Sequence, residues 1–216
     1  MLFADRSGAG RALAEKLAGS PAVAGDVLVL ALPRGGVPVA VPVAERLGAE
    51  LDIVVARKIG APGHAEFGVG ALAEDGPPVF DTHVLRYLGL SSADLAPTVA
   101  AERAELRRRV RRYRGDRPAP AVTGRCVVLV DDGLATGVTA QATVGWLASR
   151  EPARIVLAVP VCSEQARDRL GGSATVVYLH APPDFAAVGQ WYADFTQLTD
   201  ADVDAALERH ARTGTP

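Results

Sequence analysis

The sequence predicts an α/β fold in which helices cover both faces of a central parallel sheet. Two observations support this prediction. Short apolar runs alternate with segments of helical periodicity along the chain, and this alternation is typical of strand–helix–strand units. The runs are apolar throughout, as expected for strands that are buried on both faces. With 216 residues, 49% of them apolar and 22% charged, the chain is long enough for one globular domain with an insertion.

The first half of the chain is predicted to begin with a helix and to continue through alternating strands and helices. The first helix ends at Gly19, because glycine is common just after helices. The second helix has the right periodicity, although Pro42 lacks the N–H group that a helix interior uses. The predicted elements are helices over residues 7–18 and 37–48, strands over 26–32 and 51–56, and a weaker hairpin over 67–73 and 77–80.

The second half of the chain begins with a long helix and then resumes the alternation. Ser91 and Asp94 have the spacing of a helix-capping pair, which predicts a helix from there to about Arg114. Thr199 and Asp202 have the same spacing and predict the start of a last helix. The other predicted elements are a Pro/Gly loop over 115–124, strands over 126–132, 154–160 and 174–180, a helix over 137–149, a short helix after 160, and the end of the last helix near Arg212.

Composition and charge exclude several classes of protein. The formal net charge is −2, so no global basic field is available to hold nucleic acid. Cys126 and Cys162 lack the spacing of a metal site, and we expect buried free thiols in a reducing compartment. Residues 1–19 lack the apolar core of a signal peptide, and every apolar run is far shorter than the ~20 residues that span a bilayer. We therefore expect a cytoplasmic, soluble protein.

The segment VVLVDDGLATGVTA, residues 127–140, carries the clearest chemistry. Asp131 and Asp132 follow a buried strand, and a turn rich in glycine and threonine leads from them into a helix. In open α/β sheets, ligands bind beyond the carboxyl ends of the strands. The N–H groups and hydroxyls of such a turn suit a phosphate, and the two acids can accept hydrogen bonds from vicinal hydroxyls. Together these features indicate a site for a ribose 5-phosphate.

Residues 127–140 resemble the phosphoribosyl pyrophosphate signature of type I phosphoribosyltransferases, in which a hydrophobic run, two acids and a Thr-Gly-x-Thr turn follow one another. The resemblance implies a Rossmann-like central parallel sheet flanked by helices, with residues 1–216 forming a single domain. We interpret the segment of about 61–117, which is longer than in minimal family members, as an inserted helical lobe. The segment of about 180–212 would be the variable C-terminal hood on the acceptor side.

The resemblance also assigns roles to the residues of the signature. Asp131 and Asp132 would be catalytic, because they would hold the ribose hydroxyls and contact Mg²⁺, directly or through water. The Ala-Thr-Gly turn is similar to that of the adenine enzymes, whereas hypoxanthine-guanine enzymes have an aspartate at the position of Ala135. The residues that would bind the 5-phosphate are Ala135, Thr136, Gly137, Val138 and Thr139.

Two further segments are similar to family regions that bind pyrophosphate. In LALPRGGVPVA, residues 30–40, a short loop follows a strand, and in the family this loop often contains a cis peptide bond. A purely structural turn could have the same composition. In IVVARKIGAPGHAEFG, residues 53–68, two basic residues stand where the family begins its flexible catalytic loop. The residues that would bind pyrophosphate are Arg34, Gly35, Gly36, Arg57 and Lys58, of which the last two would also be catalytic.

Two segments allow more than one interpretation. The hood contains an aromatic cluster, of which Phe185 and Trp191 are the acceptor-side candidates, but packing in the core explains each of them equally well. Residues 102–117 contain eight arginines, a composition that suggests nucleic-acid binding. Apolar residues recur there at helical spacing, which indicates an amphipathic helix. We favour the interpretation in which its arginines lie on a solvated face or at an oligomer contact. The alternative is that they bind RNA or an anionic ligand.

The resemblance implies a phosphoribosyltransferase. Such an enzyme transfers phosphoribose from phosphoribosyl pyrophosphate to a nitrogen of a nucleobase-like acceptor and releases pyrophosphate. We expect Mg²⁺ as the cofactor and a homodimer as the functional unit, with no membrane partner and no nucleic-acid partner. The alternative is a non-catalytic phosphoribosyltransferase-like regulator that binds a nucleotide or RNA.

Overall fold

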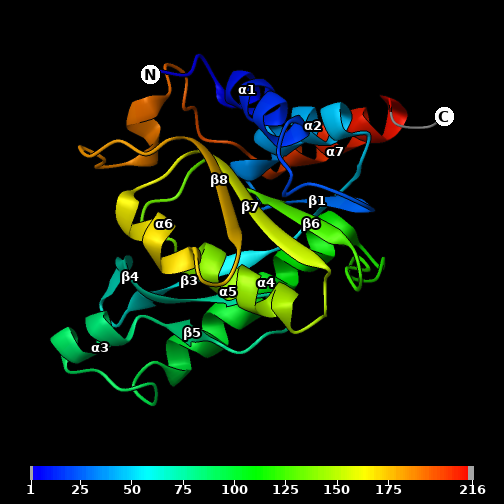
Figure 1. Ribbon diagram of the computed structural model, residues 1–216. Coiled ribbons are helices and arrows are strands. Elements are labelled where there is room, and N and C mark those ends of the chain that lie inside the picture. The colour runs from blue at the N-terminus through cyan, green and yellow to red at the C-terminus, as the bar shows by residue number, and fades with distance from the viewer. Residues whose placement is uncertain (1, 214–216) are drawn as a thin grey trace.

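A five-stranded sheet lies at the centre of the computed structural model, which describes residues 2–213 apart from the side chains of residues 65, 66, 212 and 213 (Figure 1). Each pair of neighbouring strands in it is parallel. The predicted central parallel sheet is therefore confirmed. Its order is β2 (Glu50–Ile53), β1 (Val27–Ala31), β6 (Cys126–Val130), β7 (Arg154–Val161) and β8 (Thr175–His180).

Helices cover both faces of this sheet, as the sequence predicts (Figure 1). Leu28 and Val29 are neighbours on β1, yet they point into different apolar clusters and both are fully buried. Burial on both faces explains why the strand segments are apolar throughout. The covering helices are α1 (Arg6–Ala18), α2 (Gly36–Leu47) and α7 (Asp200–Thr213) on one face, and α5 (Val138–Ala148) and α6 (Glu164–Leu170) on the other.

Helix α2 continues through Pro42, although a proline removes one helical hydrogen bond. The helix packs closely on α1. A Cβ atom on Gly10 of α1 would lie 2.5 Å from the carbonyl oxygen of Val39 and 2.7 Å from Cγ of Pro42. The absence of a side chain at Gly10 therefore lets the two helices approach, and tertiary packing of this kind overrides the low helix propensity of proline.

The strand predicted over residues 51–56 is two strands of different sheets. β2 ends at Ile53, whereas β3 (Ala56–Ala61) pairs with β4 (His64–Ala73) in an antiparallel sheet that also contains β5 (Val79–Phe80). Val54 and Val55, between the two strands, are buried like Ile53 before them, so a continuous apolar run does not reveal the change. The predicted hairpin is confirmed as β4 and β5.

The segment of about 61–117 contains the predicted hairpin together with two helices. These helices are α3 (Thr82–Leu88) and α4 (Ala96–Arg114). Helix α3 was not predicted, because seven residues are too few for a periodic pattern. The Ser91 hydroxyl does contact Asp94 at 2.6 Å, but this pair lies in a turn that precedes α4.

Helix α4 is amphipathic, as predicted. Leu106 and Tyr113 are buried, and Val99 and Val110 pack against the same apolar cluster. Neither α4 nor any other helix within residues 2–213 is long and apolar enough to cross a membrane. The exposed arginines of α4 are Arg107, Arg108, Arg111 and Arg112.

Candidate active site

The acid pair of the signature lies where two neighbouring strands end. Asp131 and Asp132 follow β6 directly, and the loop after the adjacent strand β1 packs against them. A Cβ atom on Gly36 would lie 2.5 Å from the carbonyl oxygen of Val130, and one on Gly35 would lie 2.0 Å from Oδ2 of Asp132. Such distances are too short for real side chains, so both positions require glycine. The structure thus brings the predicted ribose-binding acids and the predicted pyrophosphate loop together.

Burial dominates the electrostatics of the acid pair. Burial, and then the negative charge of Asp132, raise the pKa of the Asp131 carboxyl well above its usual range. Burial also raises the pKa of Asp132, and the guanidinium of Arg6 opposes that rise. Asp131 Oδ1 accepts a hydrogen bond from the backbone N–H of Asp132 at 2.9 Å. The charged form of the pair is therefore costly, and a cation or the hydroxyls of a sugar would stabilise it.

Two residues that the sequence analysis did not select contact Asp132. Nε of Arg6 lies 2.8 Å from Oδ2 of Asp132, and the hydroxyl of Tyr192 donates to the backbone carbonyl of Asp132 at 2.6 Å. Arg6 is 126 residues away along the chain, so no motif spacing reveals it. Tyr192 belongs to the aromatic cluster of the hood, but nothing in the sequence distinguishes it from its neighbours there.

The N-terminal segment packs on the hood (Figure 1). The backbone N–H of Phe3 donates to the carbonyl of Trp191 at 2.8 Å, and Phe3 forms a parallel bridge with Tyr192. The ring of Trp191 packs edge-on against His180, with 5.0 Å between centroids, and Phe185 is partly buried in the hood's apolar cluster. Trp191 and Phe185 therefore have packing partners inside the hood, and their acceptor role stays a prediction.

The turn between β6 and α5 has the shape that a phosphate site needs. Gly137 has a φ of +73° at the N-cap of α5, in the left-handed region that favours glycine. Ala135 and Thr136 are exposed just before it, and no described side chain caps this helix. The N–H groups of a helix N-terminus attract anions. Binding of a 5-phosphate by this turn stays a prediction that the geometry permits.

The loop after β1 contains a cis peptide bond between Pro33 and Arg34, in keeping with the resemblance. The positive charge of Arg34 also acts on Tyr113 of α4. Burial and a hydrogen bond to Asp200 raise the pKa of Tyr113 to about 12, and the charge of Arg34 opposes that rise.

Arg57 and Lys58 lie on opposite faces of β3. The guanidinium of Arg57 lies 2.7 Å from Glu102 on α4. The side chain of Lys58 instead lies over Gly68 of β4, where a Cβ atom would be 2.9 Å from Cδ of Lys58. Successive side chains of a strand point to opposite faces, so the structure separates two residues that the sequence analysis had placed in one role.

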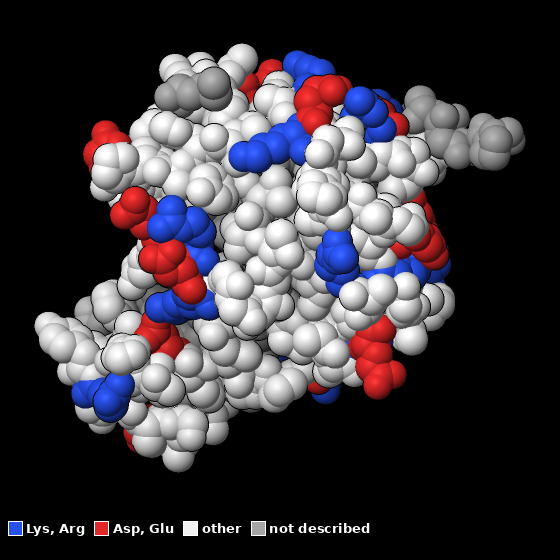
Figure 2. Space-filling model, in the orientation of Figure 1, with Lys and Arg blue, Asp and Glu red and all other residues white. Residues whose placement is uncertain are grey.

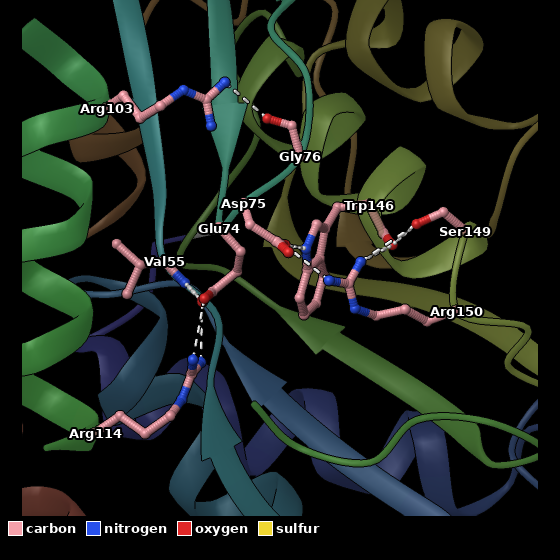
Figure 3. A network of polar contacts seen from close by, with 9 residues as sticks. All are labelled: Val55, Glu74, Asp75, Gly76, Arg103, Arg114, Trp146, Ser149 and Arg150. Atoms are coloured by element: carbon pink, nitrogen blue, oxygen red, sulfur yellow. Dashed lines mark hydrogen bonds and ion pairs between the residues drawn. The ribbon is translucent and has the colours of Figure 1, made fainter. Parts of the chain in front are cut away.

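A buried ion pair, the Arg114–Glu74 clamp, holds the junction between β2 and β3 (Figure 3). Arg114, at the end of α4, contacts both carboxylate oxygens of Glu74 and the carbonyl of Ile53, each at 3.0 Å. Glu74 also accepts a hydrogen bond from the N–H of Val55 at 2.7 Å. The clamp therefore fixes the backbone immediately before the segment that contains Arg57.

The acid pair suits a hard divalent cation such as Mg²⁺. Mg²⁺ prefers oxygen ligands, retains several waters, and is commonly held by one or two carboxylates together with substrate phosphates. Within the described part of the chain, no group of three or more His, Cys, Asp or Glu side chains is arranged to hold a metal. Asp131 and Asp132 thus fit a cation that is bound together with a phosphate ligand, and Mg²⁺ itself stays a prediction.

Charged side chains of both signs are interspersed on the face shown in Figure 2, and no broad basic area covers it. On α4, Arg108 and Arg109 contact Glu105 at 2.7 and 2.9 Å, and Arg112 contacts Asp204 of α7 at 2.7 Å. These acids neutralise part of the arginine-rich face. The structure therefore favours the interpretation in which the arginines of α4 lie on a solvated face, where several of them pair with acids.

Comparisons with known proteins agree with this geometry. Residues 6–178 match the family model of the phosphoribosyl transferase domain. "Putative phosphoribosyl transferase Rv0571c" of Mycobacterium tuberculosis is 44% identical over 212 residues, which are 98% of this chain and 47% of that protein. The chain thus spans about half the length of the curated relatives it matches.

Two solved structures have a similar fold. TT1426 from Thermus thermophilus has a TM-score of 0.80 at 49% identity, over 97% of this chain and 99% of that one. A hypothetical protein from Neisseria gonorrhoeae, crystallised with bound ppGpp, has a TM-score of 0.54 at 14% identity and covers 96% of each chain. The second likeness concerns the fold alone.

Proposed function

Because the chain belongs to the phosphoribosyl transferase domain family, we propose that it transfers phosphoribose from phosphoribosyl pyrophosphate to a nitrogen of a nucleobase-like acceptor. One observation carries the proposal. The acid pair at the end of β6 packs directly on the glycine loop after β1, with Gly35 against the carboxylate of Asp132. The proposed sugar-hydroxyl site and the proposed anion-binding loop would therefore lie side by side at the carboxyl edge of the sheet, where ligands of α/β proteins bind.

In the proposed reaction, the bond between C1 of the ribose and the pyrophosphate oxygen breaks, and the acceptor nitrogen forms a new bond to C1. Positive charge grows on the ribose while negative charge grows on the leaving pyrophosphate. Asp131 and Asp132 would hold the 2- and 3-hydroxyls and place negative charge near the ring. The N–H groups of Gly35 and Gly36, with Arg34, would stabilise the leaving group. Preorganised charges of this kind lower the barrier because they interact most strongly with the transition state.

The basic residues of β3 contribute unequally in this proposal. The side chain of Lys58 is exposed, on the face of β3 opposite to α4. Arg57 is less exposed and pairs with Glu102 of α4 at 2.7 Å. We propose that Lys58, the more exposed of the two, contacts the leaving group first.

We propose Mg²⁺ as the cofactor, held by Asp131 and Asp132 directly or through water. When bound, it would neutralise phosphate charge and orient the ribose and pyrophosphate oxygens. Phosphoribosyl pyrophosphate carries more negative charge than Arg34 and Lys58 can balance. Calorimetric titration should therefore detect binding with Mg²⁺ and little binding in excess chelator, and equal affinity in both conditions would contradict the metal proposal.

On the acceptor side, we propose that the hood covers the nucleobase-like acceptor, with Phe185 and Trp191 as the first candidates for contact. Val188 of the hood already touches the site, because a Cβ atom on Gly133 would lie 2.6 Å from Cγ1 of Val188. Ala135 supplies no carboxylate for acid–base work on the acceptor. We further propose a cytoplasmic homodimer, which cell fractionation and light scattering of the purified protein would test.

The decisive experiment measures pyrophosphate release from phosphoribosyl pyrophosphate, with Mg²⁺ and a panel of nucleobases. We expect release with at least one base, and no release from the double variant Asp131→Asn, Asp132→Asn, which keeps the shape but not the charge of the pair. Asp168→Asn is the matched control, since Asp168 is exposed and pairs at the surface with Arg167 at 3.0 Å. Near-wild-type release from the double variant would show that the ribose assignment is wrong. Binding without release from any base would support the non-catalytic regulator instead.

A further inference from the structure

We infer that Arg6 is a positioning residue, which holds the carboxylate of Asp132 in place and ties it to the hood. The inference depends on the proposed function only for its effect on ligand affinity. Its starting point is the ion pair between Arg6 and Asp132. The side chains of Arg6 and Asp132 are 11% and 15% exposed, and Nε lies 2.8 Å from Oδ2.

The guanidinium of Arg6 is itself held from two other directions. Nη1 donates to the carbonyl of Thr196 at 3.0 Å, and Cζ lies 3.9 Å from the centre of the Phe195 ring. A planar guanidinium can make these contacts at once because its N–H groups diverge in fixed directions. Lysine, with a single ammonium group, cannot reach Asp132 and Thr196 with the same geometry. Arg6 therefore bridges the acid pair and the hood segment 192–196, which we call the hood strap.

The backbone that carries Arg6 is anchored to the same hood strap. Asp5 caps α1 by accepting a hydrogen bond from the N–H of Gly8 at 2.6 Å. Just before it, the carbonyl of Ala4 accepts a hydrogen bond from the N–H of Asp194 at 2.9 Å. The start of α1 and the hood strap thus form one connected unit, from which the side chain of Arg6 extends to Asp132.

Asp132 is also confined from its other sides. Its carboxylate lies against Gly35, and its carbonyl accepts the hydroxyl of Tyr192 at 2.6 Å. Arg6 donates to Oδ2, and the remaining acceptor positions of the carboxylate are left for a ribose hydroxyl or a cation. Without Arg6, the carboxylate would be free to turn about its side-chain bonds and would face the charge of Asp131 without a counter-charge. Loss of Arg6 should therefore disorder the acid pair and loosen the hood strap together.

The first part of the test uses the ligand-free protein, so it does not depend on the reaction. Arg6→Met removes the contacts and keeps a long side chain, and Arg6→Lys keeps the charge. Arg46→Gln is the matched control, because Arg46 also pairs through Nε at 2.8 Å with a carboxylate, that of Glu15 on α1, but at the surface. Amide hydrogen exchange should rise several-fold in residues 131–134 and in the hood strap of Arg6→Met. It should be unchanged there in Arg46→Gln.

The second part measures the affinity for phosphoribosyl pyrophosphate with Mg²⁺. We expect Arg6→Met to weaken binding at least tenfold, Arg6→Lys to recover part of the loss, and Arg46→Gln to bind within twofold of wild type. Exchange that rises only within α1, or an Arg6→Met affinity within twofold of wild type, would overturn the inference. If wild type itself does not bind, the proposed function fails, and the exchange result still decides whether Arg6 couples Asp132 to the hood strap.

Discussion

Replacing Arg114 by methionine should cost this protein about 3–5 kcal/mol of unfolding free energy, the range measured when one partner of a buried ion pair is removed. The side chains of Arg114 and Glu74 are only 3% and 6% exposed. Methionine fills most of the arginine volume, so the cost comes mainly from the carboxylate left inside the protein. Glu74 would keep only the N–H of Val55, at 2.7 Å, as a donor.

Thermal unfolding followed by calorimetry measures this effect directly. For domains of 150–250 residues, 1 kcal/mol corresponds to roughly 2–4 °C of midpoint, so Arg114→Met should unfold about 6–20 °C earlier. Arg108→Met is the matched control on the same helix, because Arg108 is 55% exposed and its contact with Glu105 lies at the surface. Such surface pairs contribute about 0–1 kcal/mol.

A second variant separates the unpaired charge from lost packing. Adding Glu74→Gln to Arg114→Met removes the charge while an amide oxygen still accepts from Val55. The double variant should recover at least ~1 kcal/mol relative to Arg114→Met alone, as expected for side chains in direct contact. If Arg114→Met and Arg108→Met unfold within 2 °C of each other, the reasoning about the clamp is refuted.

Three further predictions concern the site and α4. Gly35→Ala should abolish binding of phosphoribosyl pyrophosphate, measured by calorimetry, since its Cβ would lie 2.0 Å from Oδ2 of Asp132; retained affinity would show that the loop moves freely. The pKa of Tyr113 is raised to about 12, so this group stabilises the folded state below pH 10, and its contribution disappears as the pH rises toward 12. Tyr113→Phe should therefore lose less thermal stability than wild type as the pH rises above 10. A profile of stability against pH that is as steep as that of wild type would argue against this reasoning. Replacing Arg107, Arg108, Arg111 and Arg112 with glutamine should leave the ligand affinity, measured by calorimetry, within a few-fold of wild type, and electrophoretic mobility shifts should reveal no RNA function. Sub-micromolar RNA binding by wild type in ~150 mM salt that this variant loses would favour the regulator.

Local sequence patterns predicted most of the fold. The inner strands β1, β6 and β7 are apolar on both faces, so their positions follow from composition alone. Thr199 with Asp202 correctly marks the start of α7. The junction after Ile53 could not be predicted, because the chain changes sheets without leaving the core. What identifies that junction is the Arg114–Glu74 clamp, a contact between residues 40 apart.

In the candidate site too, residues within short motifs were predictable and residues brought together by distant contacts were not. Asp131, Asp132 and the glycine loop lie within short motifs, and their proximity follows from the parallel order of β1 and β6. The opposite faces of Arg57 and Lys58 were not predicted, because the predicted strand ends at residue 56 whereas β3 contains both residues. The roles of Arg6 and Tyr192 were not predictable, since only the folded hood brings them to Asp132.

The bridge from Arg6 to Thr196 has a consequence for how the protein is made. The two residues are 190 apart, and the contact with Asp132 spans 126. A nascent chain on a ribosome can form β1, α2 and β6 early, but it cannot complete the acid pair's surroundings until the hood strap has left the exit tunnel. Contacts between such distant residues slow folding, because a long loop must close before they form. Partly synthesised chains that stop before the hood strap should therefore hold a folded sheet with an incomplete site, and ligand affinity should emerge only in chains long enough to expose residues 192–196.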